Sequence, residues 1–271
     1  MEQRKRGIDE GVGFDWGKTS EDYGRYRDIY PPVFYEKIAA RNLCVSGQRI
    51  LDLGTGTGVL PRNMYSRGAE WVGVDLSENQ IAEAKKISAA QKKDIQYIVG
   101  AAEKIDFPLC CFDVVTACQC FWYFDHKELA LKLWQSLKED GKLLILYMAW
   151  LPFKDEIAGA SEQLVLEYSP QWTGAGEWLH PIQVPDCVSR LFEPVYHEEY
   201  EIELPFTRES WNGRMKTCRG IGASLEPEQL REWEERHRRL LQQIAPERFF
   251  VKHYAAMLEM KRRHPEEIVK M

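Results

Sequence analysis

The sequence has 271 residues, of which 44% are hydrophobic and 29% are charged. This is the composition of a globular protein and argues against disorder, and the length is enough for one substantial core plus a smaller cap. The formal charge of −6 gives no general attraction to nucleic acid, whose binding depends on neutralising phosphates. We therefore expect no nucleic-acid partner.

The N-terminal residues, the apolar runs and the cysteines indicate the cellular compartment. Residues 2–6 are polar or charged and lead into no apolar stretch, so no secretory signal is expected. The longest apolar run, Leu143 to Leu151, is too short to span a bilayer. The seven cysteines show no C-x-x-C spacing. We read them as reduced thiols without a metal site, and we expect a cytoplasmic protein that makes no membrane contact.

Two helices are predicted before residue 46. A stretch over residues 20–30 carries three tyrosines at helical spacing, and Pro31-Pro32 breaks it. Residues 33–41 read as a second helix, because proline is tolerated before a helix and in its first turn but not in its interior.

Short apolar runs then alternate with helical segments up to residue 150. Strands are expected over residues 49–53, 71–75, 95–99, 112–117 and 142–150. Helices are expected over 59–67, from Ser77 with Gln80 completing a capping box, and from Asp125 to a terminating Gly141. Five such alternations predict parallel strands joined by right-handed crossovers, which is a Rossmann-like α/β sheet.

The remainder has a different character. Residues 152–195 are rich in Trp, Pro and Gly and lack this rhythm. A strand over 200–206, helices over 209–218 and 226–244, and a last strand over 249–258 follow.

A glycine loop follows the first strand, in the segment Asp52-Leu53-Gly54-Thr55-Gly56-Thr57-Gly58. Glycines let a ligand approach the backbone, and open α/β sheets bind ligands at the carboxyl ends of their strands. The dinucleotide fingerprint requires G-x-G-x-x-G, but Val59 stands where its last glycine belongs. The spacing therefore disfavours a nicotinamide oxidoreductase.

Several segments resemble one family. The loop with Leu51 and Asp52 resembles motif I of the class I S-adenosylmethionine-dependent methyltransferases, and Asp75 is similar to that family's acidic residue for the ribose hydroxyls. Residues 100–108, 112–119 and 138–144 resemble its adenine loop, fourth strand and following turn, so the match runs from 48 to 150. The resemblance implies S-adenosyl-L-methionine as cofactor, held by Asp52, Gly54, Thr55, Gly56, Gly58, Asp75, Leu76, Ala102, Glu103 and Gln119.

Each of these positions also has a purely structural interpretation. The glycines could serve only a tight turn, and Asp75 could cap the helix that starts near Ser77. Ala102-Glu103 could be an ordinary loop, and Gln119 could simply finish a strand.

The segment from Tyr23 to Pro31 resembles a Tyr/Arg/Pro segment that precedes motif I in small-molecule members of the family. There it forms a lid whose arginine can meet the cofactor's carboxylate, which implies roles for Tyr23 and Arg27. The usual Arg-Pro dipeptide is Arg27-Asp28 here, and a surface arginine is the alternative. We expect a helical lid over 1–46, a core over 47–151, and a mainly helical cap after the fifth strand. Residues 152–271 then hold this cap and the final strands of a mostly parallel, seven-stranded sheet flanked by helices.

The cap should select the acceptor. It is rich in aromatic side chains, and three cations suit an anionic acceptor; these residues are Trp150, Trp172, Trp178, His180, Trp211, Arg214, Lys216 and Arg219. Alternatively, the tryptophans are the cap's own core and the cations are exposed. His180 and His253 are the candidate general bases, but lone histidines are usually structural or surface residues, and we name no catalytic base.

The sequence thus predicts a methyltransferase for a small-molecule acceptor, with the acceptor atom (O, N, S or C) and the oligomeric state left open. Other sulfonium chemistry on the same cofactor and a non-catalytic, regulatory cofactor-binding role are the alternatives.

Overall fold

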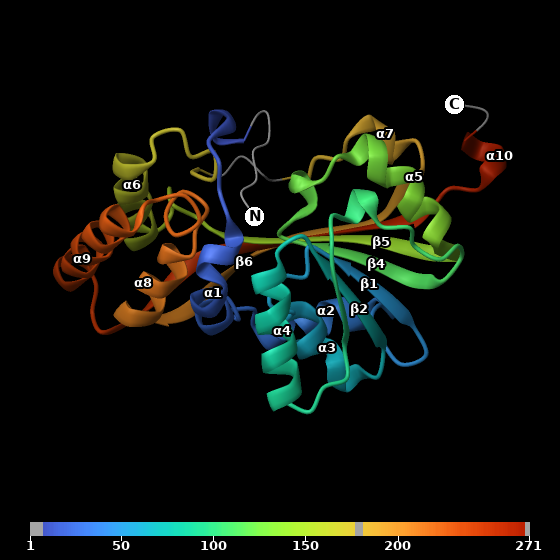
Figure 1. Cartoon of the computed structure of the whole chain (residues 1–271), viewed down its shortest axis with the longest axis horizontal. Coiled ribbons are helices and arrows are strands. Elements are labelled where there is room, and N and C mark those ends of the chain that lie inside the picture. Colours follow the sequence, from blue (N-terminus) through green and yellow to red (C-terminus); the bar gives the residue numbers. More distant parts are fainter. Residues whose placement is uncertain (1–7, 177–180, 269–271) are drawn as a thin grey trace. The chain divides into compact units, whose positions relative to one another are not determined.

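A computed structural model describes residues 8–176 and 181–268 (Figure 1). Its strands form one seven-stranded sheet in the order β3-β2-β1-β4-β5-β7-β6. Their bounds are β1 Arg49–Leu53, β2 Glu70–Asp75, β3 Gln96–Val99, β4 Phe112–Cys118, β5 Leu137–Trp150, β6 Phe192–Thr207 and β7 Arg248–Arg262. Among the helices of these residues, none combines the length and the apolar character that a bilayer crossing requires.

The first five strands of the chain pair in parallel. The last strand runs against β5, because the end of β5 meets the beginning of β7: the Leu151 N–H donates to the Lys252 carbonyl at 2.9 Å. At the other end, Arg262 donates to the carbonyl of Leu137. Central side chains such as Leu51 and Val115 are completely buried, as in a sheet covered on both faces. The predicted seven-stranded, mostly parallel sheet is confirmed.

Ten α-helices are present in the described residues, and polar side chains cap the starts of α4 and α5. Their bounds are α1 Ser20–Tyr26, α2 Pro32–Ala40, α3 Val59–Met64, α4 Glu78–Ala90, α5 His126–Ser136, α6 Glu156–Tyr168, α7 Asp186–Ser189, α8 Arg208–Lys216, α9 Pro227–Ile244 and α10 Pro265–Ile268. The Ser77 side chain accepts from the Gln80 N–H, and Asp125 accepts from the Lys127 N–H. Both expected cap residues therefore satisfy otherwise free N–H groups at the helix starts.

Gly141 does not end α5, contrary to expectation. The helix stops at Ser136, and Gly141 lies inside β5. The buried side chain of Leu137 pairs with Phe112, and the register then jumps so that Val114 pairs with Lys142. Residues 138–141 thus bulge out of the ladder, because tertiary pairing of Leu137 prevails over the local glycine signal.

The described residues form two compact units. Unit 1 comprises residues 8–29, 149–176 and 201–254, with α1, α6, α8 and α9. Unit 2 comprises residues 30–148, 181–200 and 255–268, and the division falls within three long strands. In unit 2, helices α2, α3 and α4 lie on one side of the parallel strands and α5 and α7 on the other (Figure 1). The lid and cap boundaries expected from the sequence do not coincide with this division, and they stay predictions.

Candidate functional site

Four strand ends of unit 2 meet at one edge of the sheet. Leu53 at the end of β1 lies between Val74 of β2 and Ala117 of β4. The Thr55 N–H donates to the Val74 carbonyl, and the Gly100 N–H donates to the Asp75 carbonyl, each at 2.9 Å. The glycine loop, Asp75, the loop from Gly100 and the end of β4 are therefore neighbours, as parallel strands require.

The glycine loop has a backbone that side chains tolerate poorly. Gly54, Gly56 and Gly58 have φ values of 55°, 56° and 75°, in the left-handed region. A Cβ on Gly58 would lie 2.2 Å from the Tyr97 hydroxyl oxygen, and one on Gly54 would lie 2.8 Å from the Cys120 Cβ. Part of the glycine requirement is thus structural, since these two positions are closed by the protein's own side chains.

Asp75 joins β2 to the glycine loop. Its Oδ2 accepts from the Gly56 N–H at 2.9 Å, and its Oδ1 accepts from the Ser77 N–H at 2.8 Å. Burial raises the pKa of this carboxyl, and the two N–H donors oppose that increase. A carboxylate oxygen can accept more than one hydrogen bond, so each oxygen of Asp75 retains acceptor capacity for one of two vicinal hydroxyls. This donor and acceptor pattern fits the ribose of an adenosyl group.

Asp52 lies in the core below the loop. It is 2% exposed and accepts a hydrogen bond from the Thr116 hydroxyl at 2.5 Å. Burial raises the pKa of Asp52 to about 6, and the hydrogen bond from Thr116 limits the increase. Asp52 therefore links β1 to β4 and places a titratable group beneath the glycine loop.

The other expected site residues of unit 2 lie on the adjoining loops. Ala102 is buried, and the Glu103 carboxylate accepts from the Asp125 N–H at 2.8 Å, which ties this turn to the start of α5. Gln119 adopts a left-handed backbone with φ of 66°, and its amide donates to the Met148 carbonyl. Leu76 is half-buried directly after β2. Their roles toward a ligand stay predictions.

Two cysteines, Cys118 and Cys120, lie against the site. The Cys120 thiol donates to the Leu53 carbonyl at 3.0 Å, and the Cys118 thiol donates to the Tyr30 hydroxyl at 3.5 Å. Burial raises the pKa of Cys118 to about 12 and that of Cys120 well above its usual range. Both thiols are protonated at neutral pH, so they act as small packing groups rather than nucleophiles.

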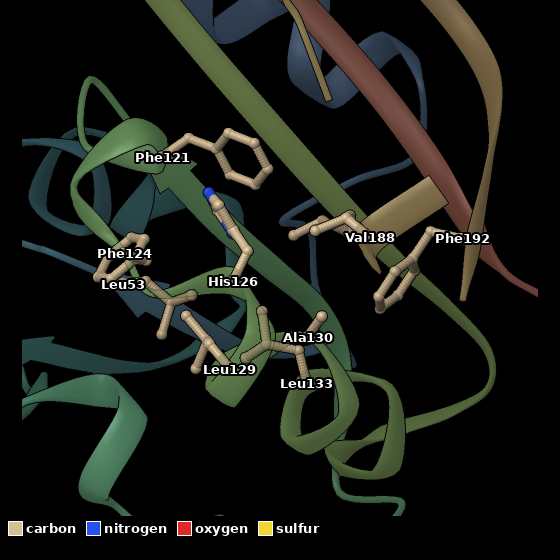
Figure 2. A pocket seen from close by; sticks show the side chains of 10 residues that line it. Leu53, Phe121, Phe124, His126, Leu129, Ala130, Leu133, Val188 and Phe192 are labelled. Carbon is tan, nitrogen blue, oxygen red and sulfur yellow. The ribbon is translucent and has the colours of Figure 1, made fainter. Parts of the chain in front are cut away.

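An apolar hollow lies beside β1 and α5 (Figure 2). Its lining is apolar except for His126, whose ring lies 4.2 Å from that of Phe121, centroid to centroid. The lining residues are Leu53, Phe121, Phe124, His126, Leu129, Ala130, Leu133, Leu143, Val188 and Phe192. Such a lining suits helix packing and offers little to a polar nucleoside.

Tyr23 and Arg27 belong to unit 1. The Arg27 guanidinium carbon lies 4.8 Å from the centroid of the Tyr23 ring, and its N–H groups donate to Thr217. Their expected roles toward the cofactor stay predictions.

Most of the residues expected to bind the acceptor are buried and pack against other side chains of unit 1. Trp150, Trp172 and Trp211 are buried and pack on one another, with ring centroids 6.4 and 5.8 Å from that of Trp150. Arg214 is buried, with its guanidinium carbon 5.0 Å from the Trp150 ring centroid. The interpretation as a core therefore fits the three tryptophans, whereas Arg214 is buried and not exposed as that interpretation expected. Trp178 and His180 lie outside the described residues.

Two of the three cations proposed for an anionic acceptor are neutralised by the protein. Arg219 forms a buried ion pair with Asp9, with a Nε–Oδ2 distance of 2.5 Å, and Lys216 pairs with Asp22 and Glu234. Asp9 and Asp22 are distant from these cations in the sequence, so no local pattern indicates the pairing. The charges of Lys216 and Arg219 are thus offset by carboxylates of the protein, and their expected role toward an acceptor stays a prediction.

Comparison with known proteins identifies the domain that contains these residues. Residues 51–145, which contain the glycine loop and Asp75, match the family model of a methyltransferase domain. This part of the chain is a methyltransferase domain. For residues 51–145, the class I S-adenosylmethionine-dependent methyltransferase family predicted from the motifs is confirmed, and S-adenosylmethionine is the cofactor of that family.

Relatives and solved structures agree with this domain. The chain is 32% identical over 158 residues to the ubiquinone biosynthesis O-methyltransferase of Bradyrhizobium diazoefficiens, covering 57% of this chain and 60% of that protein. The mitochondrial enzyme of the same name from Schizosaccharomyces pombe is 33% identical over 44% of this chain and 42% of that protein. The chain thus spans less than two thirds of these relatives.

A solved structure shares the fold. Phosphoethanolamine N-methyltransferase 2 of Haemonchus contortus, in complex with phosphomonomethylethanolamine and S-adenosylhomocysteine, has a TM-score of 0.54 at 20% identity. The match covers 91% of this chain and 58% of that one.

Proposed function

We propose that this protein transfers a methyl group from S-adenosylmethionine to a small-molecule acceptor. The observation that carries the proposal is the junction of Asp75 with the glycine loop through the Gly56 N–H. The junction fixes a carboxylate beside a loop that lacks side-chain bulk at Gly54, Gly56 and Gly58. Such a site suits the vicinal hydroxyls of an adenosyl ribose.

Binding and orientation are the tasks left to the chain. The bound sulfonium supplies an activated methyl group, so the protein must align an acceptor with it and exclude water. Asp75 would hold the ribose, and Ala102-Glu103 would border the adenine. Because burial lowers the pKa of His253 to about 3, this histidine is a weak base and we assign it no proton transfer.

An oxygen nucleophile is the first acceptor class to test, since the relatives named above are O-methyltransferases. A cytoplasmic location and the absence of nucleic-acid and membrane partners stay predictions. Cell fractionation checks the location. This test is worthwhile because one of the relatives is a mitochondrial enzyme.

Calorimetric titration with S-adenosylmethionine, S-adenosylhomocysteine and NAD tests the cofactor. We expect saturable binding of the first two and none of NAD; the reverse would overturn the proposal. Incubation with methyl-labelled cofactor and a metabolite extract then tests the reaction, because label must appear in a small-molecule product.

The two alternatives predict other outcomes. Release of methylthioadenosine without methyl transfer would indicate other sulfonium chemistry. Tight cofactor binding without turnover on broad acceptor sets would indicate a regulatory role.

A further inference from the structure

We propose that Cys110 and Cys111 form a modification site whose thiols exchange with an anionic, low-molecular-weight disulfide. Both cysteines are free, and Cys110 is exposed. They directly precede β4, at the amino ends of the parallel strands, whereas the glycine loop lies at the carboxyl ends. The pair is thus a second site, and its chemistry does not depend on the proposed function.

Each of the two sulfurs contacts a guanidinium from another strand. The Arg49 Nη1–H donates to the Cys111 Sγ at 2.8 Å, and the Arg262 Nη1–H donates to the Cys110 Sγ at 3.9 Å. Arg49 begins β1 and Arg262 ends β7, so two strands bring one cation to each thiol. All four residues belong to unit 2. Partly exposed thiols in electropositive surroundings are the reactive ones in proteins.

The charges of these two arginines are not offset by acidic partners. Within the part of the chain that the structure describes, neither Arg49 nor Arg262 forms an ion pair with a carboxylate. The adjacent acid, Asp113, pairs with Lys138 at 2.8 Å. Arg262 lies over the Trp134 ring, with its guanidinium carbon 3.8 Å from the ring centroid. The surplus of positive charge beside the thiols favours a disulfide that carries carboxylates, such as glutathione disulfide.

The backbone fixes the two cysteines in different surroundings. Cys110 has a φ of 48°, in the left-handed region that residues other than glycine seldom adopt. Its N–H donates to the Gln135 carbonyl at 2.9 Å, and the Cys111 N–H donates to the Ser136 carbonyl at 2.7 Å. The end of α5 thus holds a turn that exposes Cys110 and leaves Cys111 half-buried. Cys110 is therefore the thiol that a disulfide reaches first.

The exchange has two steps. The Cys110 thiolate, which has given its proton to water, attacks one sulfur of glutathione disulfide. A mixed disulfide forms, the S–S bond of the reagent breaks, and one glutathione thiolate leaves and takes up a proton from water. The Cys111 thiolate then attacks the Cys110 Sγ and displaces the second glutathione, so the protein thiols are oxidised to a disulfide and glutathione disulfide is reduced to two thiols.

A disulfide between neighbours in sequence is easily reopened. Successive Cα atoms lie about 3.8 Å apart, whereas disulfides usually join Cα atoms at least about 4.4 Å apart. The bond is therefore strained, and a reductant restores both thiols readily.

Peptide mapping by mass spectrometry, after alkylation of the remaining thiols, measures the exchange at each cysteine. The full-length protein is incubated at low salt with glutathione disulfide, which is anionic, or with cystamine, which is a cationic disulfide. Cys187 is the internal reference, because it is half-buried and, over residues 8–176 and 181–268, no guanidinium donates to its thiol. We expect the preference for glutathione disulfide over cystamine to be about tenfold larger at Cys110 than at Cys187. Salt should reduce this difference to about twofold or less.

Matched variants test the charges and the second thiol. Arg49→Gln and Arg262→Gln each remove a positive charge, and each should lower the preference at Cys110 about threefold. Arg49→Lys and Arg262→Lys keep the charge and should retain the preference. Cys111→Ser should stop the reaction at the mixed disulfide, so that glutathione stays on Cys110 and no second glutathione is released.

Three results would overturn the inference: equal preferences at Cys110 and Cys187, no modification of Cys110, or a glutathione adduct that persists on Cys110 of the unsubstituted protein. All three are measured on the unsubstituted protein, so a variant that fails to fold does not remove the test.

Discussion

The carboxylate of Asp75 accepts a hydrogen bond from the backbone N–H of Gly56 at 2.9 Å. Asp75 at the end of β2 thereby fixes the glycine loop that follows the neighbouring strand β1. The same contact shows that Asp75 does more than cap α4, although its other oxygen does accept from the Ser77 N–H.

Replacing Asp75 by Asn should weaken S-adenosylhomocysteine at least tenfold, because an amide has only one oxygen acceptor for the loop and the ribose together. Calorimetry measures the affinity. The charge-matched control is Asp106→Asn, since the Asp106 side chain is fully exposed. Equal affinities of the two variants would contradict the assignment.

Gly58→Ala should destabilise the protein by about 2 kcal/mol or more, because φ is 75° and the new methyl group meets the Tyr97 hydroxyl. Urea denaturation measures the free energy of unfolding. Tyr97→Phe removes the hydroxyl and its hydrogen bond to Ser88. The double variant should therefore lose less than the sum of the single losses. Simple additivity would show that backbone strain alone explains the glycine.

The stability of the protein should depend on pH through Asp52. Because its folded pKa of about 6 lies above the unfolded value, the carboxyl favours folding at low pH and loses this contribution as pH rises from about 4 to 6. From pH 5 to pH 7 we expect a loss of about 1 kcal/mol that Asp52→Asn removes. Urea denaturation of both proteins at the two pH values checks this. An unchanged pH dependence in the variant would show that Asp52 titrates normally.

Breaking the ion pair of Asp9 and Arg219 should be costly, because both side chains are less than a tenth exposed. Asp9→Ala leaves a buried guanidinium without its main partner, and we expect a loss of about 3 kcal/mol in the free energy of unfolding. The exposed pair of Arg25 and Glu209 provides the comparison. Glu209→Ala should cost at most about 1 kcal/mol in the same denaturation assay. If Asp9→Ala and Glu209→Ala lowered the free energy of unfolding by similar amounts, burial of the ion pair would not explain its contribution to stability.

Local signals predicted the parallel core well. The strand β1 occupies the expected residues because a buried apolar run ends at a glycine loop, and Ser77 caps α4 as its spacing indicated. These features depend on neighbours in sequence. The same reasoning missed α6, although Asp155 is its N-cap, because the aromatic and glycine-rich composition around it obscured the cap.

The candidate site was predictable in its residue types but not in its contacts. The spacing of the glycine loop indicated the ligand class. That Cys120 packs on Gly54, or that Thr217 holds Arg27, depends on packing between distant segments. Likewise, Arg219 looked available for an acceptor until the structure placed Asp9 beside it. Long-range partners of this kind carry no local sequence signal.

The pair of Asp9 and Arg219 closes a loop of 210 residues, and this affects how the protein is made. A ribosome that adds about 5–20 residues per second needs roughly ten to forty seconds to reach Arg219 after Asp9. During this time the segment around Asp9 has left the exit tunnel without its permanent contact. Unit 1 therefore completes folding late, after the central parallel strands of unit 2 have been synthesised.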